Sequence, residues 1–344
     1  MKIYKIWLKS TSLIILFILS ILALFNYLLD PLWSFNNFYF SKYKNSYNER
    51  ILKTNYLVYS NVKFDGILLG SSRTTMINID KEFNEYKLFN YASASLQINE
   101  YEGFIDNAKR INNNTLPIVI LGLDFFTYLN ETKLENEPIK YYDDTKDFFN
   151  RFKILLSYDT FKKAKKNLTI NEHIFSERVY DINYNVFTSI NTEENNRKNI
   201  NESVEKFEKE FYLKDIPIDN FKNKLKYLKE KYPDTKFVIF TTPITKELFS
   251  KILKNKKLYE LYELWINQVV SVFGEINHFM FINDISIHSS KNFYDGHHMY
   301  PFVGDIIYQS LIDGVDTNNM MKINNNNLDD MLEKLKKINF INNK

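Results

Sequence analysis

Residues 64–73 read FDGILLGSSR, an apolar run that ends at a glycine and leads into two adjacent serines. A short apolar run closed by glycine is typical of a buried strand that ends in a tight turn. Similar runs occur at residues 89–92, 116–122, 236–243 and 278–283. We therefore predict five buried strands, and the first of them delivers serine hydroxyls to its carboxyl end.

Helical patterns separate several of these strands, because apolar residues recur at helical spacing over residues 98–111, 220–231 and 258–272. Short buried strands that alternate with longer helices predict an α/β protein. We expect a mainly parallel sheet covered by helices on both faces, a three-layer α/β/α sandwich. In such sheets the active site gathers at the carboxyl ends of the strands, and the motifs discussed below sit at such ends.

The N-terminal segment is typical of a membrane anchor. Residues 10–29 are uncharged and mostly apolar, and at about 1.5 Å per residue they span about 30 Å, the thickness of a bilayer's hydrocarbon core. Lys2, Lys5 and Lys9 precede this run and Asp30 follows it. Because cations stay on the cytoplasmic side, we expect a single-pass protein with a cytoplasmic N-terminus. The chain after Asp30 would be periplasmic or on the outer face.

Two other interpretations of this segment compete with the anchor. A cleaved signal peptide needs a shorter apolar core and a small-x-small cleavage site, whereas residues 25–33 read FNYLLDPLW and are bulky. A buried helix of a soluble core is the other alternative. Trp7 and Trp33 flank the apolar run at positions where interfacial aromatic residues are expected.

The composition narrows the function classes. The 344 residues include 45 Lys and Arg against 42 Asp and Glu, and a formal charge of +3 argues against a nucleic-acid partner. There is no cysteine, which excludes disulfides, thiolate metal sites, cysteine nucleophiles and iron–sulfur clusters. Hydrophobic residues make up 44% of the chain, enough for a packed core.

The organisation along the chain follows from these patterns. Residues 1–30 form the cytoplasmic tip and transmembrane anchor, and residues 31–60 a juxtamembrane connector. The α/β domain occupies residues 61–310. Within it, residues 130–212 are charged and rich in asparagine, and we interpret them as an insertion between the third and fourth strands that acts as a lid or a partner surface. Residues 311–344 are a tail with a short helix.

Ser72 is the first candidate for chemistry. A serine on a tight turn after a buried strand exposes its hydroxyl, as a nucleophile requires. The same turn is also compatible with a helix N-cap or with a phosphate-binding nest at Gly70, as in a soluble cytoplasmic α/β protein.

The second candidate is the segment Asp295-Gly296-His297-His298. A carboxylate three residues before a histidine can accept from the imidazole Nδ1–H, which leaves Nε2 to take a proton from a serine. A surface turn and metal ligation are the alternatives. Metal ligation is the weaker of these, because adjacent histidines point apart and no further ligand cluster is evident. We expect neither a metal nor a cofactor.

The order Ser72, Asp295, His298 occurs in α/β-hydrolases, but their Gly-x-Ser-x-Gly elbow is absent here. A first-strand Gly-x-Ser turn with Asp-x-x-His near the end of the chain resembles the SGNH/GDSL hydrolase superfamily. The second block of that superfamily is an Asn-led segment with a glycine five residues on. It matches Asn90, with Ser95 in the glycine's place and its backbone N–H retained.

The third block of the superfamily is Gly-x-Asn, whose side chain donates to the oxyanion. Here it reads Gly122-Leu123-Asp124, and an ionised Asp cannot donate. Arg73 stands where the superfamily usually has an aliphatic residue. We expect Arg73 to pair with Asp124 and to place a cationic donor near the developing oxyanion. Two solvated surface residues are the alternative.

The resemblance covers about residues 64–308, apart from the insertion. It implies Ser72 as nucleophile, His298 as base and acid, Asp295 as the residue that orients His298, and Asn90, Ser95, Arg73 and Asp124 as oxyanion or supporting residues. The anchored form resembles bacterial envelope proteins of the DltD and alginate-acetylation type. That implies a serine esterase or O-acyltransferase for cell-envelope carbohydrate, beside a membrane-bound O-acyltransferase partner.

The sequence leaves open whether the domain is catalytic and which aromatic residues contact a sugar. The departure at Asp124 is also compatible with a non-catalytic SGNH-like scaffold that binds a glycan or a membrane acyltransferase. Aromatic residues near the motifs, such as Tyr294, Tyr300 or Phe125, are candidates for stacking on sugar rings.

Overall fold

The computed structural model describes residues 2–129, 143–147, 149–170, 175, 178–209, 217 and 219–341. The chain forms two compact units. The N-terminal unit comprises Met1–Val62 and Pro138–Ser189, and the sheet unit comprises Lys63–Glu137 and Ile190–Lys344. The segment 130–212, interpreted from the sequence as one insertion, is therefore divided between the two units, and part of it lies outside the described residues.

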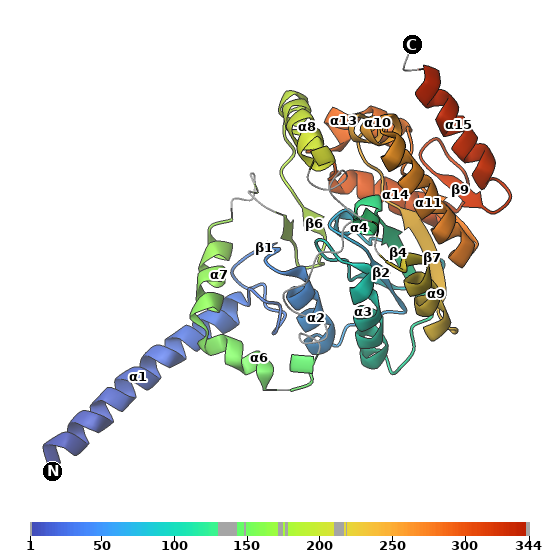
Figure 1. The fold of residues 1–344 in the computed structure, drawn as a ribbon. Coiled ribbons are helices and arrows are strands. Elements are labelled where there is room, and N and C mark those ends of the chain that lie inside the picture. The colour runs from blue at the N-terminus through green and yellow to red at the C-terminus, as the bar shows by residue number, and fades with distance from the viewer. Residues whose placement is uncertain are drawn as a thin grey trace. The chain divides into compact units, whose positions relative to one another are not determined.

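The sheet unit is an α/β domain with a mixed, mostly parallel sheet of six strands in the order β3-β2-β4-β7-β8-β9 (Figure 1). The first five of these pair in parallel, and β9 pairs antiparallel with β8 at one edge. The α/β class and the mainly parallel sheet predicted from the sequence are confirmed. The strands are β2 (Gly66–Leu69), β3 (Leu88–Asn90), β4 (Ile118–Leu123), β7 (Lys236–Thr241), β8 (Glu275–His278) and β9 (Met321–Asn324).

The central strands form because their apolar residues are covered on both faces. All four residues of β2 and all six of β4 are buried, which explains their short unbroken apolar runs. The last predicted strand is wrong in its bounds, since β8 ends at His278. Beyond it, the Thr241 hydroxyl accepts hydrogen bonds from the backbone N–H groups of Phe279 and Met280, at 3.0 and 3.2 Å, and this replaces further strand pairing.

The helices of the sheet unit include three that match the predicted ranges: α3 (Ile98–Ile111), α9 (Phe221–Lys231) and α11 (Lys256–Phe273). In Figure 1 they lie side by side, with α9 in contact with both α3 and α11. The segment after residue 311 is more than a tail, because it supplies β9. The remaining elements are η1 (Thr74–Met76), α4 (Phe125–Leu129), α8 (Glu193–Phe207), α10 (Lys246–Lys254), α12 (Asp284–Ile287), α13 (Ser289–Asn292), α14 (Pro301–Asp313) and α15 (Leu328–Ile341).

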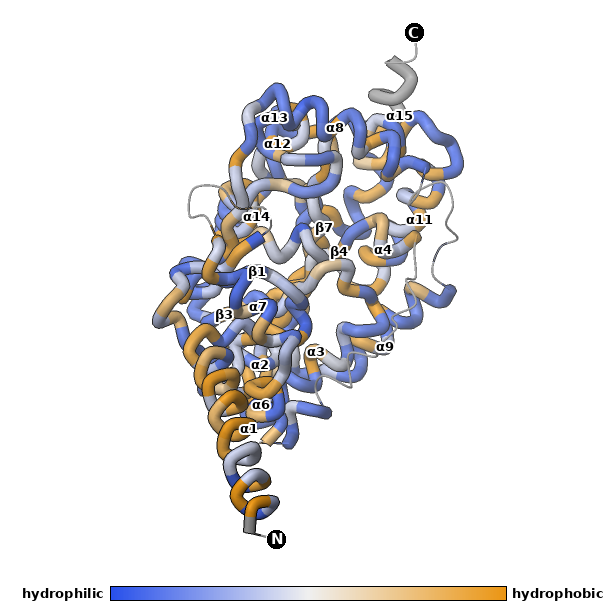
Figure 2. The backbone as a smooth tube through the Cα atoms, turned by 90° about the vertical axis from the view of Figure 1, so that its left-hand side faces the viewer, coloured by the Kyte–Doolittle hydropathy of each residue, from blue (hydrophilic) through white to orange (hydrophobic). Residues whose placement is uncertain are grey.

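The N-terminal unit begins with helix α1 (Lys2–Leu29). Its segment Ile3–Leu29 is long and apolar enough to cross a membrane and is mostly uncovered by the rest of the chain, as the hydrophobic colour along α1 shows in Figure 2. A small antiparallel sheet has the order β1-β5-β6. The unit's other elements are β1 (Lys44–Asn45), α2 (Glu49–Tyr59), α6 (Asn150–Lys153), η2 (Ile154–Leu156), α7 (Tyr158–Leu168), β5 (Val179–Tyr180) and β6 (Val186–Phe187).

Trp33 belongs to the core of this unit. It is fully buried, with the rings of Tyr180 and Tyr184 at 5.1 and 4.6 Å. The prediction that Trp33 lies at a membrane interface is therefore wrong. The chain turns back at this point because the buried Asp30 carboxylate accepts from the backbone N–H groups of the following loop and faces the Lys44 ammonium at 3.5 Å.

Candidate active site

Ser72 lies on the turn that follows β2, and its position depends on close packing at two glycines. A Cβ at Gly70 would lie 2.8 Å from the carbonyl oxygen of Gly122 and would overlap the Thr74 hydroxyl, so only glycine fits there. The Thr75 hydroxyl donates to the Ser72 carbonyl at 2.7 Å and fixes the start of η1. Ser72 itself remains partly exposed.

Asp295 and His298 lie in the segment between α13 and α14. His298 Nδ1 is 2.8 Å from Asp295 Oδ2, and Asp295 Oδ1 accepts from the backbone N–H groups of His297 and His298, both at 2.7 Å. These three hydrogen bonds fix the carboxylate and the imidazole relative to each other. The Ser203 hydroxyl accepts from the Gly296 N–H at 2.7 Å and holds the turn from the side of α8.

The structure brings Ser72 and His298 together across 226 residues of sequence, with 2.9 Å between Ser72 Oγ and His298 Nε2. Burial alone would raise the pKa of Asp295, but the charge of His298 and the hydrogen bonds from His298 and His297 outweigh it and lower that pKa. An ionised Asp295 only accepts, so it selects the imidazole tautomer with the proton on Nδ1. Nε2 is then the acceptor for the Ser72 hydroxyl proton.

Arg73 and Asp124 form an ion pair in the interior rather than at a solvated surface. Arg73 Nη1 lies 3.0 Å from Asp124 Oδ1, and each side chain is 1% exposed. Thr242, at the carboxyl end of β7, accepts from Arg73 Nη1 at 3.0 Å and donates to Asp124 Oδ1. The guanidinium also lies over the Phe126 ring, 4.9 Å from its centroid. Within the described part of the chain, Nε and Nη2 of Arg73 have no hydrogen-bond partner.

Asn90 and Ser95 lie beside the nucleophile turn. The Asn90 amide donates to the carbonyls of Thr74 and Ile77 at 3.0 and 2.8 Å, so it braces the turn that carries Ser72. Ser95 has a backbone φ of +51°. That conformation is unusual for residues with a side chain and favours glycine, which is the residue that the resemblance puts at this position.

The sequence did not single out Thr242, and it suggested His297 only through the alternative of metal ligation. The His297 ring is buried and stacks on Phe207, with centroids 3.9 Å apart. Burial, together with the charges of Arg73 and His298, holds its pKa well below the ordinary value, so the ring is neutral at pH 7. Thr242 fell inside the strand predicted over residues 236–243; because β7 ends at Thr241, Thr242 instead lies at the carboxyl end of the sheet, as Ser72 and Asp124 do.

The aromatic residues considered for sugar stacking differ in access. Tyr300 and Phe125 are fully buried, whereas Tyr294 is partly exposed. The Tyr294 ring lies parallel to the His298 imidazole, with centroids 5.5 Å apart and 5° between the planes. Of the three, Tyr294 is thus the one in reach of a ligand at His298.

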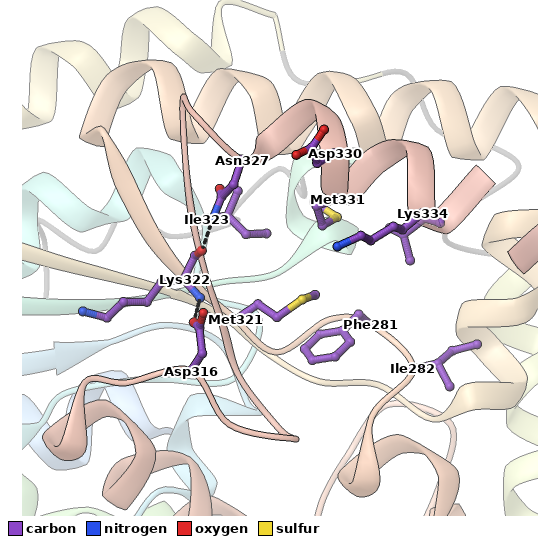
Figure 3. A pocket seen from close by; sticks show the side chains of 11 residues that line it. Phe281, Ile282, Asp316, Met321, Lys322, Ile323, Asn327, Asp330, Met331 and Lys334 are labelled. Atoms are coloured by element: carbon purple, nitrogen blue, oxygen red, sulfur yellow. Dashed lines mark hydrogen bonds between the residues drawn. The ribbon is translucent and has the colours of Figure 1, made fainter. Parts of the chain in front are cut away.

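Elsewhere in the described residues, we looked for groups that could bind a metal ion or catalyse a reaction. No group of three or more His, Asp or Glu residues there is arranged to hold a metal ion. A cavity of about 350 Å³ lies between β9 and α15 (Figure 3). Two of its polar side chains are engaged with the backbone of β9: Asp316 accepts from the Lys322 N–H at 2.6 Å, and Asn327 donates to the Lys322 carbonyl at 2.8 Å. The cavity contains no pairing of a nucleophile with a base.

Comparison with known proteins gives no assignment: no family model, no curated protein and no solved structure matches the chain.

Proposed function

We propose that the protein is an SGNH-like serine ester hydrolase or O-acyltransferase that acts on acyl esters of cell-envelope carbohydrate. The observation that supports this most strongly is the hydrogen-bonded series Ser72 Oγ, His298 Nε2, His298 Nδ1 and Asp295 Oδ2, with distances of 2.9 and 2.8 Å. The finer fold assignment, a three-layer α/β/α sandwich, is part of this proposal. It is supported by the contacts among α3, α9 and α11, and by separate contacts between α14 and η1.

The reaction would proceed in two halves. Ser72 Oγ attacks the ester carbonyl carbon while His298 Nε2 takes the hydroxyl proton. Collapse of the tetrahedral intermediate breaks the bond to the alcohol oxygen, which leaves with the proton from His298, and the acyl group remains on Ser72. A water or a sugar hydroxyl then attacks the acyl carbon as His298 removes its proton. The products are a free acid or a new ester, and Ser72 regains its proton.

The oxyanion would be stabilised in a different way from the superfamily pattern. The backbone N–H groups of Ser72 and Ser95 are the donors that the resemblance implies. Asp124 cannot donate, and we assign its role to holding Arg73, which follows the nucleophile directly. The buried guanidinium then contributes a fixed positive charge in a region of low dielectric, where such charges act most strongly.

The N-terminal helix would anchor the enzyme in the cytoplasmic membrane, with Lys2, Lys5 and Lys9 on the cytoplasmic side and the remainder extracytoplasmic. An envelope glycan is the acceptor or donor in this proposal, and a membrane-bound O-acyltransferase is its partner for acyl supply. The length of α1 and its uncovered apolar surface support the anchor.

A serine pair on one turn allows a matched test. Cells that express Ser72→Ala in place of the native chain should change in the amount of ester-linked acyl groups that mild alkali releases from envelope carbohydrate. A fall indicates a transferase, and a rise indicates a hydrolase. Ser71→Ala removes the neighbouring hydroxyl, which accepts from the Arg73 N–H, and should leave the acyl content near normal. Equal acyl content in Ser72→Ala and native cells would instead favour the non-catalytic scaffold.

A further inference from the structure

Within the N-terminal unit, α6, η2 and α7 are joined to the C-terminal end of α1 (Figure 1). The Asn26 amide donates to the carbonyls of Leu155 and Ser157 at 2.8 and 3.1 Å. The rings of Phe25 and Phe161 meet with centroids 5.0 Å apart. These contacts fix α6, η2 and α7 at the point where α1 ends.

Large apolar side chains are exposed at the start of α6, within α6, in η2 and in α7. Phe149, Phe152, Leu156 and Tyr158 are 69, 39, 52 and 65% exposed. Apolar side chains gathered on one surface mark a contact with a membrane or a partner. Tyr is enriched where a membrane meets water, and Phe and Leu are typical of the face that an interfacial helix buries in lipid; these four residues are of those types.

Helix α7 adds positive charge beside these residues. Its sequence YDTFKKAKKNL contains four lysines and one acidic residue. Its buried side is formed by Thr160, Ala164 and Asn167, so the lysines lie toward its outer surface. Lys162 is mostly exposed, with its ammonium 4.7 Å from the centre of the Tyr158 ring. Lysines that lie beside exposed apolar side chains suit a contact with the anionic headgroups of a membrane surface.

The place where α6, η2 and α7 contact α1 is consistent with a position at the membrane surface. Most side chains of α1 from Leu22 to Leu29 are at least partly covered. At the usual helical rise, this covered part makes up about the last 10 Å of the helix. Interfacial helices bury their apolar face about 5–10 Å into the boundary between headgroups and acyl chains. The uncharged span predicted from the sequence, residues 10–29, ends at the same residue, so these covered side chains lie within about 10 Å of that membrane surface.

We propose that α6, η2 and α7 form an interfacial platform on the leaflet from which α1 emerges. Phe149, Phe152, Leu156 and Tyr158 insert at the acyl boundary, and the α7 lysines contact anionic headgroups. The occupant of this surface is therefore lipid rather than another protein. The inference rests on the proposed membrane anchor and extends it, because the chain would meet the membrane through a second, non-spanning element.

The absence of cysteine allows a direct test with the full-length protein in vesicles, since one introduced thiol is the only one to react. A nitroxide is placed in turn at Leu156→Cys and Tyr158→Cys. Phe17→Cys in the exposed part of α1 is the reference for the membrane interior, and Val315→Cys, an exposed position of the sheet unit, is the reference for water. The measurement is the relaxation of each label by oxygen, which concentrates in lipid, relative to that by a water-soluble nickel chelate.

The platform predicts that the ratio of oxygen to nickel accessibility at residues 156 and 158 is severalfold above that at residue 315. In phosphatidylcholine vesicles that contain phosphatidylglycerol, the joint change of Lys162→Glu and Lys165→Glu should lower that ratio. If residue 17 reports lipid while residues 156 and 158 report water, the platform is refuted and the anchor stands. If residue 17 also reports water, the anchor itself fails. A protein partner would be indicated if the labels at residues 156 and 158 gave water-like ratios of oxygen to nickel accessibility in vesicles and a protein could be cross-linked to the same two positions. That result would overturn the proposal.

Discussion

The buried pair of Arg73 and Asp124 makes a quantitative prediction about stability. Both side chains are 1% exposed and lie 3.0 Å apart, so removal of one partner leaves the other charge buried and unpaired. Breaking a buried ion pair in this way costs about 3–5 kcal/mol. We therefore expect Asp124→Asn and Arg73→Leu each to lower the free energy of unfolding of the sheet unit by about that amount.

The double variant is the sharper part of this prediction. Replacing both charges removes the unpaired partner, so the two changes together should cost less than the sum of the single changes. We expect a coupling energy of at least about 2 kcal/mol. The amide introduced at position 124 can still accept from Thr242, and the leucine side chain introduced at position 73 keeps an apolar contact with Phe126.

The assay is urea unfolding of the full-length protein in detergent, followed by the fluorescence of Trp265. This residue is buried in α11 of the sheet unit, and Trp7 and Trp33 are replaced by Phe so that the signal reports one unit. Single changes that cost less than about 1 kcal/mol would refute the reasoning, because that is the value of an exposed pair. If the loss of unfolding free energy in the double variant equalled the sum of the two single losses, the predicted coupling would be refuted. Unchanged esterase activity in both single variants would remove Arg73 from the oxyanion hypothesis.

Two further predictions concern the triad and the core. Asp295→Asn should lower kcat on a simple ester such as p-nitrophenyl acetate about 10³–10⁴-fold, because the new amide faces His298 Nδ1 and moves the imidazole proton to Nε2. Asp329→Asn, at the exposed start of α15, is the control, and a loss below tenfold for Asp295→Asn would contradict the assigned role. His278 is buried between Thr241 and Tyr262, and burial lowers its pKa to about 3. Its folded pKa is below the ordinary 6.5, so its contribution to stability is complete above pH 6.5 and is lost as the pH falls toward 3. We expect the unfolding free energy to fall by about 2 kcal/mol from this group between pH 8 and pH 5, and a His278→Gln variant with an equally steep fall would disprove that origin.

The sequence was informative where a strand is short, apolar and closed by a polar turn. β2, β4 and β7 have that pattern, and their carboxyl ends carry Ser72, Asp124 and Thr242. Parallel strands align these ends at one edge of the sheet, so residues distant in sequence come together without any local signal. Thr242 was missed because the strand predicted over residues 236–243 continued past the end of β7 at Thr241.

The sequence was least informative about the N-terminal unit. β1, β5 and β6 are two residues long each, too short for an alternating pattern to be recognised. The joining of residues 138–189 to the N-terminal segment depends on tertiary contacts such as that between Asn26 and Leu155. Likewise, nothing local distinguishes Trp33, which is buried by Tyr180 and Tyr184, from a tryptophan at a membrane interface.

The proposed function requires that Ser72 is a nucleophile activated by His298. The most direct measurement is covalent labelling of the full-length protein in detergent by a fluorophosphonate, with the modified residue located by mass spectrometry. We expect a single adduct on Ser72, absent in His298→Ala and retained in Ser71→Ala. An adduct on another serine, equal labelling of Ser72 in His298→Ala, or no adduct at all would contradict it.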